Sequence, residues 1–220
     1  MRGAVYVDGF NLYHAIDDLR QQHLKWLDLW RLGELVARGH ASSIEEVVFC
    51  SAYFPGNHGK KVRHTAYKDA LENAGVRCLM GHTTKEPMEC KTEINGCGNR
   101  WDQPREKETD INLALSLYNG AIDDIYDVAF LITADTDQAA TLKMVRRRFA
   151  DKQLIAVYPP GRQVSKHLRD LTDKQIRLKE QHIDECLFPP MVMAKGKRTI
   201  IRPHEYAPPE DWVHPDKRPK

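Results

Sequence analysis

Short runs of apolar residues alternate along this chain with longer segments in which apolar residues recur every three or four positions. The first pattern predicts buried strands and the second predicts amphipathic helices. The predicted strands cover residues 4–7, 46–53, 76–80, 127–133 and 153–157. The predicted helices cover residues 27–37, 62–74, 109–118, 137–149 and 165–171, with a further helix starting near Leu12. This alternation predicts an α/β fold in which helices cover both faces of a mainly parallel sheet.

Two segments lack this periodicity. Residues 81–106 are polar and carry His, Cys, Asn and Gly without a clear repeat, so we expect a long loop or a small insertion there. From about residue 186 the composition shifts to Pro, Lys, Arg and His, which predicts a basic tail over 186–220, either disordered or draped over the domain. The predicted domain therefore covers residues 1–185.

Composition narrows the class of protein. Of the 220 residues, 41% are hydrophobic, which is enough to bury a core, and the net charge is only +2. Attraction to a polyanion must therefore come from local clusters of basic residues. No apolar run approaches the ~18 residues of a membrane helix, and we see no signal peptide. Five cysteines, an odd number, do not suggest a disulfide framework, so we expect a cytoplasmic protein.

Polar residues stand where the apolar strands end. Asp8 and Asn11 follow the first strand, Asp135 and Asp137 follow the strand at 127–133, and Asp110 begins a helix. In open α/β sheets, the loops beyond the carboxyl ends of the strands converge on one site. We therefore expect these carboxylates to lie close together.

Carboxylates that converge repel one another unless a cation lies between them. Hard oxygen ligands select Mg²⁺ or Mn²⁺, which position phosphate oxygens and lower the pKa of bound water. That chemistry hydrolyses phosphodiester bonds. Each aspartate taken singly is equally well explained as a helix cap or a solvated turn residue. The combination of all of them at strand ends favours the metal site.

Three motifs carry a family resemblance. The runs V-D-G-F-N at 7–11, K-E-T-D-I-N-L-A-L at 107–115 and L-I-T-A-D-T-D at 131–137 are similar to the patterns V-D-G-x-N, K-G-x-D-V-x-L and S-G-D-x-D. These patterns are typical of the NYN branch of the PIN-like nuclease superfamily, which the chain resembles over roughly 1–171. The resemblance implies a PIN-like (Rossmann-like) three-layer sandwich and a metal-dependent endoribonuclease that uses Mg²⁺ or Mn²⁺.

Roles follow from the resemblance position by position. It implies a metal-binding cluster of four aspartates, namely Asp8, Asp110, Asp135 and Asp137. In the mechanism that we favour, the first three hold one metal ion and Asp137 orients or deprotonates the attacking water. Asn11 orients a water or a carboxylate, and Lys107 lies beside the scissile phosphate, where its charge offsets that of the transition state.

The chain also departs from the family's patterns. Many relatives carry an aspartate at the position of Ser116, a glycine at that of Glu108 and Ser-Gly at that of Thr133-Ala134. The serine leaves the number of bound metals open, and Glu108 either replaces the missing carboxylate or faces solvent. A catalytically impaired RNA-binding regulatory protein of the same fold is therefore an alternative. A metal-dependent phosphatase is another, although its nucleophilic aspartate usually stands in D-x-D after the first strand, where this chain has D-G-F-N.

A zinc site is a separate hypothesis. Cysteine and histidine residues lie within or next to the polar segment at 81–106, namely Cys78, His82, Cys90 and Cys97. Their spacings, C-x3-H, H-x7-C and C-x6-C, lack the C-x2-C pairs that are typical of structural zinc sites. Free thiols in a loop that contacts substrate are the alternative.

A basic cluster follows the aromatic residues at 53–54. It consists of Lys60, Lys61, Arg63 and Lys68. Basic residues next to aromatic ones suit a single-stranded nucleic acid, whose bases stack on the rings. A solvated helix face explains the same pattern. We expect RNA as the partner, with single-stranded DNA as an alternative because only 2′-hydroxyl contacts separate the two. Trp26 and Trp30 indicate either core packing or a homodimer surface.

Overall fold

The computed structural model describes residues 1–53, 57–90, 97–193 and 199–218. Within these residues, one sheet of seven strands has the order β4-β3-β2-β1-β5-β6-β7. Its strands are β1 (Arg2–Asp8), β2 (Ser43–Ala52), β3 (Arg77–Glu89), β4 (Arg100–Lys107), β5 (Val128–Ile132), β6 (Gln153–Tyr158) and β7 (Lys174–Arg177). All neighbouring strands are parallel except β3 and β4.

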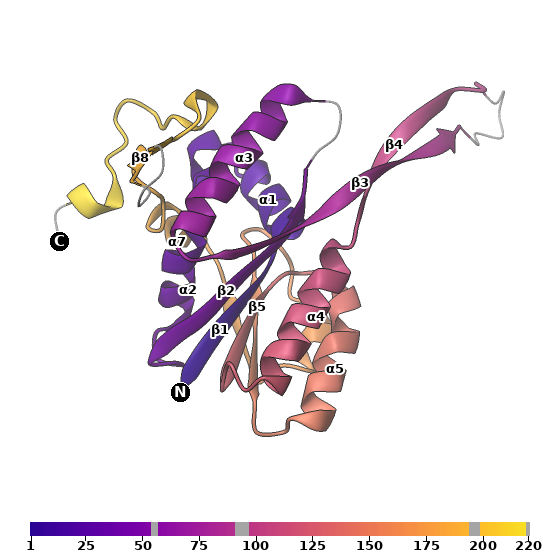
Figure 1. The fold of residues 1–220 in the computed structure, drawn as a ribbon, viewed down its shortest axis with the longest axis vertical. Coiled ribbons are helices and arrows are strands. Elements are labelled where there is room, and N and C mark those ends of the chain that lie inside the picture. The colour runs from indigo at the N-terminus through magenta and orange to yellow at the C-terminus, as the bar shows by residue number, and fades with distance from the viewer. Residues whose placement is uncertain (54–56, 91–96, 194–198, 219–220) are drawn as a thin grey trace.

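Helices cover both faces of the sheet (Figure 1). One face carries α1 (Gly9–Asp18), α2 (Leu29–Ala37), α3 (His58–Asn73) and the short α7 (Glu180–Asp184), and the other carries α4 (Thr109–Ile122), α5 (Ala139–Arg148) and α6 (Lys166–Arg169). The central strand β1 is buried on both sides, because Val5 and Val7 enter one core while Ala4 and Tyr6 enter the other. The predicted three-layer, mainly parallel fold is confirmed.

The polar segment at 81–106 is the main correction. Where it is described, it is a β-hairpin: β3 continues to Glu89 and pairs antiparallel with β4, in a register that runs from His82–Lys107 to Glu89–Arg100. Residues 91–96 lie outside the described part of the chain. Figure 1 shows this arm projecting away from the body of the domain. Both faces of the arm are exposed to solvent over most of its length, so no apolar alternation marks it as a strand pair.

The chain beyond β6 forms more structure than the sequence indicated. The edge strand β7, α7 and a small antiparallel pair, β8 (Met191–Val192) with β9 (Ile200–Ile201), were not predicted. Between 199 and 218 the tail drapes over the domain, since Tyr206 joins the core and Trp212 Nε1 donates to Asp184 Oδ1 at 2.6 Å. The basic positions at 194–198 and 219–220 lie outside the described residues.

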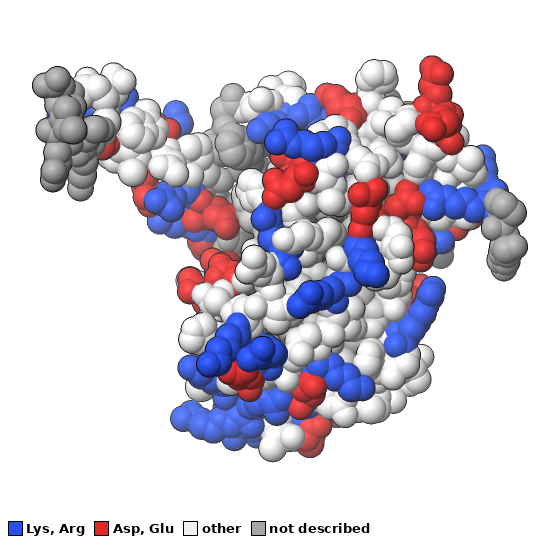
Figure 2. Space-filling view, turned by 180° about the vertical axis from the view of Figure 1, so that it is seen from behind, with Lys and Arg blue, Asp and Glu red and all other residues white. Residues whose placement is uncertain are grey.

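The strand order reverses at β1, which has β2 and β3 on one side and β5, β6 and β7 on the other. In open parallel sheets, ligands bind beyond the carboxyl ends of the strands at such a reversal. Both signs of charge are interspersed over the rear face of the domain (Figure 2). Within the described residues, we find no helix with the length and apolarity that spanning a membrane requires.

Candidate metal centre

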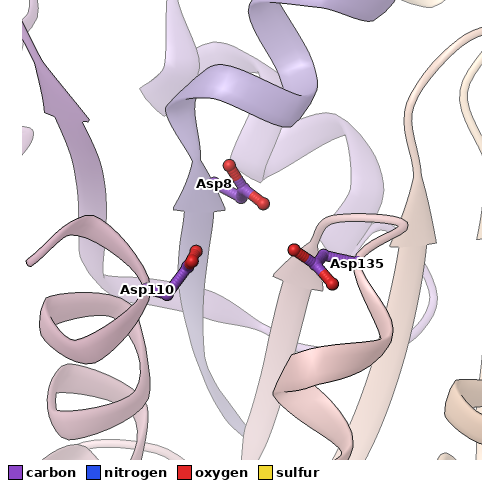
Figure 3. Close-up of side chains that lie close together, drawn as sticks. All are labelled: Asp8, Asp110 and Asp135. Atoms are coloured by element: carbon purple, nitrogen blue, oxygen red, sulfur yellow. The ribbon is translucent and has the colours of Figure 1, made fainter. Parts of the chain in front are cut away.

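Three aspartates from distant parts of the chain meet beyond the strand ends. Asp8 ends β1, Asp135 follows β5 through a short loop, and Asp110 lies in the first turn of α4. One carboxylate oxygen of each lies within 4.8 Å of the other two. Their side chains point toward a common space (Figure 3). The predicted convergence of these three residues is therefore present in the structure.

Asp8 is held rigidly although it is almost fully buried, with 8% of its surface exposed. It caps the N-terminus of α1, where its Oδ1 accepts a hydrogen bond from the backbone N–H of Asn11 at 2.9 Å. Its Oδ2 accepts from Thr133 Oγ1 at 2.8 Å. The cap is thus a structural role that Asp8 fulfils together with its place in the cluster.

Thr133 connects the two strand ends. Its buried hydroxyl donates to Asp8 and also accepts from the backbone N–H of Asp135 at 3.0 Å. Asn11 adds a second link, because its Oδ1 accepts from the backbone N–H of Ala134 at 3.1 Å. Thr133 keeps the hydroxyl of the serine that the family's pattern has here, so this departure preserves the contact. Sequence reasoning had not given Thr133 a role.

The N-terminus of α4 places Asp110. The residue before the helix, Glu108, has a left-handed backbone with φ of 77°, which explains why relatives have glycine there. Its carboxylate lies 3.3 Å from His82 on β3 and is exposed, so it does not replace a missing ligand. Gln138, which is buried, donates to the carbonyl oxygen of Asp110 at 3.2 Å and ties α4 to the loop of Asp135.

The electrostatics of the cluster are unfavourable without a cation. Burial raises the pKa of Asp8, and the charge of Asp135 raises it further, against the lowering effect of the hydrogen bonds to Asp8. Burial also raises the pKa of Asp110, with added contributions from Asp8, Asp135 and Asp137. Converging carboxylate oxygens are the ligands that Mg²⁺ and Mn²⁺ prefer. The donor set therefore fits a hard divalent cation.

A fourth carboxylate lies beside the three aspartates. Glu106, near the end of β4, has an Oε2 that is buried and has no hydrogen-bond partner among the described residues. Burial raises the pKa of Glu106 to about 7, and the charges of Asp110, Asp8 and Asp135 contribute to the rise. A buried, unpartnered oxygen is costly unless something absent from the chain itself completes it. A cation or a water in the cluster would do so, and the sequence analysis had missed this residue.

Two residues that the resemblance placed in the site lie differently. Asp137 is exposed and lies outside the set of three oxygens, although its N–H donates to Asp135 Oδ1 at 3.0 Å. The Nζ of Lys107 lies 2.9 Å from Glu86 Oε1 on the neighbouring strand of the arm. Successive side chains of a strand point to opposite faces. The charges of the aspartates act on Glu106 and raise its pKa, so Lys107, the next residue, belongs to the opposite face of β4.

Ser116 does not remove a ligand from this cluster. Six residues separate it from Asp110, which corresponds to ~9 Å along the axis of α4 and to a different face of the helix. It is buried and lines a separate hollow with Glu46 and Arg77. A carboxylate at this position would therefore lie apart from the three aspartates.

The four residues of the zinc hypothesis do not come together in the described part of the chain. Cys78 and Cys90 lie at opposite ends of the β3 region, where a rise of ~3.3 Å per residue separates them by about 40 Å. His82 pairs with Glu108. The extended course of the arm is the physical reason, because a strand cannot bring ligands that are many residues apart onto one ion.

The basic cluster lies along α3, beside the aromatic ring of Tyr53. Lys61 Nζ lies 5.9 Å from the centre of that ring. Arg63 pairs with Glu205 at 2.6 Å and Lys68 with Glu72 at 2.7 Å, so part of the cluster's charge is neutralised within the domain. No carboxylate stands between His58 and Tyr67. The N-terminal half of α3 is therefore the more basic part.

Comparisons with known proteins agree with this architecture. The model of the NYN domain family matches residues 2–179. The chain is 28% identical to 6-hydroxy-3-succinoylpyridine 3-monooxygenase HspA of Pseudomonas putida, over 96% of this chain and 77% of that protein. The crystal structure of a protein of unknown function from Vibrio parahaemolyticus resembles the fold with a TM-score of 0.54 and 16% identity, over 85% of this chain and 96% of the other.

Proposed function

Since the chain belongs to the NYN domain family, we propose that it is a divalent-metal-dependent endoribonuclease that hydrolyses phosphodiester bonds of RNA. The observation that carries the proposal is the convergence of Asp8, Asp110 and Asp135, whose oxygens lie within 4.8 Å of one another at the strand-order reversal. A site with several negative charges does not attract a phosphodiester unless a cation offsets them. A metal ion would therefore be needed both to hold the carboxylates together and to bind the substrate.

We assign the metal to Asp8, Asp110 and Asp135. A bound Mg²⁺ or Mn²⁺ would polarise a phosphate oxygen and lower the pKa of a coordinated water. Glu106 has a buried oxygen without a hydrogen-bond partner in the described chain, and the charges of the aspartates raise its pKa. We therefore assign it the role of accepting a proton from the attacking water. Asp137, which is exposed, contributes negative charge near Asp110 and is not a direct ligand in this scheme.

The chain's other residues hold this arrangement. Thr133 and Asn11 fix the separation between the ends of β1 and β5. Residues that orient the ligands of a metal commonly change its affinity ~10–100-fold when they are replaced. The basic half of α3 would draw the RNA backbone toward the site by charge attraction. Cys50, Cys78, Cys97 and Cys186 carry free thiols in the described part of the chain, and this suits the cytoplasmic location that we propose.

Cleavage of a labelled single-stranded RNA tests the proposal. Wild-type protein should cleave it with Mn²⁺ or Mg²⁺ and not in EDTA, and Asp135→Asn should abolish cleavage. Asp123→Asn, at the far end of α4, is the matched control and should cleave as the wild type does. RNA binding without any metal-dependent cleavage would instead support the impaired, RNA-binding alternative. A matching set of single-stranded DNA substrates decides between the two nucleic acids.

A second candidate function has one observation in its favour. The Pseudomonas relative that spans nearly the whole chain is named as a monooxygenase of a substituted pyridine, and an aromatic-lined cavity lies beside the carboxylates here. A monooxygenase adds one atom of O₂ to its substrate and reduces the other to water with two electrons from a reductant. Oxygen uptake that depends on both an aromatic acid and an added two-electron reductant would favour this function over hydrolysis.

A further inference from the structure

A cavity of about 230 Å³ opens next to the carboxylate cluster, between α1 and α3 and over the end of β2. Gly9, which directly follows Asp8, forms part of its wall. Asp8 and Cys50 are register partners on β1 and β2, and Ser51, the next residue, also lines the cavity. The cavity therefore adjoins the end of β1 that carries Asp8.

The walls are aromatic. Five phenylalanine and tyrosine rings line the cavity, namely those of Phe10, Tyr13, Phe49, Tyr67 and Tyr206. A volume of 230 Å³ is just below the ~300–1,000 Å³ of pockets that enclose drug-sized molecules. It suits one planar ring or two fused rings. Flat aromatic walls favour a flat aromatic ligand, because stacking buries both faces of its ring.

The polar lining residues are of two kinds, a neutral pair and several charged groups. In the neutral pair, Ser51 is buried and its Oγ lies 3.5 Å from His64 Nε2. Burial lowers the pKa of His64 to about 4, so its ring is neutral at pH 7 and offers one hydrogen-bond donor and one acceptor. Lys25, Lys60 and Arg63 are the cations among the lining residues, and Asp17 is the carboxylate.

Two of the lining cations are paired within the chain, Lys25 with Asp17 and Arg63 with Glu205. The start of α3 nevertheless remains basic, because the sequence between His58 and Tyr67 contains Lys60, Lys61 and Arg63 and no carboxylate. A ligand that matches both the neutral polar pair and the basic helix start has an uncharged ring with hydrogen-bonding edges and an anionic group outside the ring. A nucleotide has this form.

We propose that this cavity binds a nucleobase of the RNA next to the scissile phosphate, with the sugar-phosphate backbone passing over the basic start of α3. The inference rests on the proposed function and adds one specific contact, between a base of the RNA and this cavity. A base would leave the stack of its neighbours, lie between the aromatic walls and direct its polar edge at Ser51 and His64. Since Gly9 in the cavity wall directly follows Asp8, the phosphate on the sugar of this base would lie next to the carboxylate cluster.

The first test is binding, which does not require cleavage. The probe is the 5′-monophosphate of 2-aminopurine riboside, whose fluorescence falls when its ring stacks on another. In EDTA, wild-type protein should quench it, while Tyr13→Ala and His64→Leu should each weaken binding roughly tenfold, within the range for one stacked base. Trp101→Ala, which removes an exposed ring on the arm, is the control and should bind as the wild type does. Equal binding by all four proteins would overturn the proposal.

Two further experiments identify the ligand. Pyridine-3-carboxylate should displace the probe at least tenfold less well than adenosine 5′-monophosphate, and equal displacement would overturn the proposal in favour of a small aromatic acid. With Mn²⁺, RNA oligonucleotides that carry one abasic ribose at successive positions should lose cleavage about tenfold at one bond near the gap. Tyr13→Ala should slow cleavage of intact RNA and remove that difference. If no RNA is cleaved while the nucleotide still binds as expected, the proposed function fails and the base site stands.

Discussion

Replacing Asp110 by asparagine should stabilise the protein in the absence of metal and make it less stable than the wild type when a metal ion is bound. Two unit charges at 4.8 Å repel each other by about 1 kcal/mol in water and about 3 kcal/mol at an effective dielectric constant of ~20. Asp110 is exposed, so solvent screening places its interactions with Asp8 and Asp135 at the lower end, about 1–2 kcal/mol together. Loss of a carboxylate from the first turn of α4 offsets ~0.3–1 kcal/mol of this.

In EDTA at pH 7, Asp110→Asn should therefore unfold with a free energy about 1 kcal/mol higher than the wild type, which raises the Tm by about 2–4 °C in a domain of this size. With Mn²⁺ at 100 times its Kd, the wild type should gain about 2.7 kcal/mol. The variant, which has lost one of three ligands, should gain less than about 0.5 kcal/mol if its affinity falls ~100-fold. The order of the two Tm values then reverses.

Thermal unfolding followed by circular dichroism, with EDTA and with a series of Mn²⁺ concentrations, measures both effects. Asp123→Asn, at the C-terminal cap of the same helix, is the matched control and should keep the full response to metal. The reasoning is refuted if the same protein, wild type or Asp110→Asn, has the higher Tm both in EDTA and with Mn²⁺. It is also refuted if the control loses its response as Asp110→Asn does.

Three further predictions concern the residues around the aspartates. The pKa of Glu106 is raised from 4.5 to about 7. The protonated form therefore favours the folded state, and this contribution is fully present below about pH 4.5 and is lost as the pH rises through about 7. In EDTA, Glu106→Gln should flatten the fall in unfolding free energy between these pH values, and an unchanged slope would contradict this. Glu108→Gly should raise the unfolding free energy by about 0.5–1 kcal/mol in urea titrations, because a φ of 77° strains a residue with a side chain; a loss of stability would show that the pair with His82 matters more. Thr133→Val should weaken Mn²⁺ binding about 10–100-fold by calorimetry, whereas Thr133→Ser should retain it; equal losses in the two variants would show that the hydroxyl is not the cause.

The central layer of the fold was predictable because its strands are buried. Strands such as β1 and β5 must be apolar on both faces, and this leaves a continuous run of apolar residues that any sequence reader can find. The arm of β3 and β4 has no such constraint, since solvent covers most of it on either side. The edge strand β7 was missed for the same reason, since most of its residues are exposed.

The residues of the candidate site also fall into those that the sequence indicated and those that it did not. Asp8, Asp110 and Asp135 were identified because each follows a recognisable strand or begins a recognisable helix, and parallel topology then requires that such ends meet. Glu106 was missed because its direction depends on the pleat of a strand that the sequence did not reveal. Lys107, its neighbour, was assigned to the site from the family resemblance, whereas in the structure its Nζ pairs with Glu86 on the neighbouring strand.

The order of apolar and polar positions was thus sufficient for the class of fold and for the three aspartates that meet, because burial and chain direction affect the local sequence. The family followed from the resemblance of three short motifs. The identity of the fourth carboxylate, the hydroxyl of Thr133 that joins two strand ends, and the aromatic cavity between α1 and α3 are not indicated by the local sequence. Each depends on contacts between residues that are far apart in the chain. Those contacts exist only once the helices have docked on the sheet.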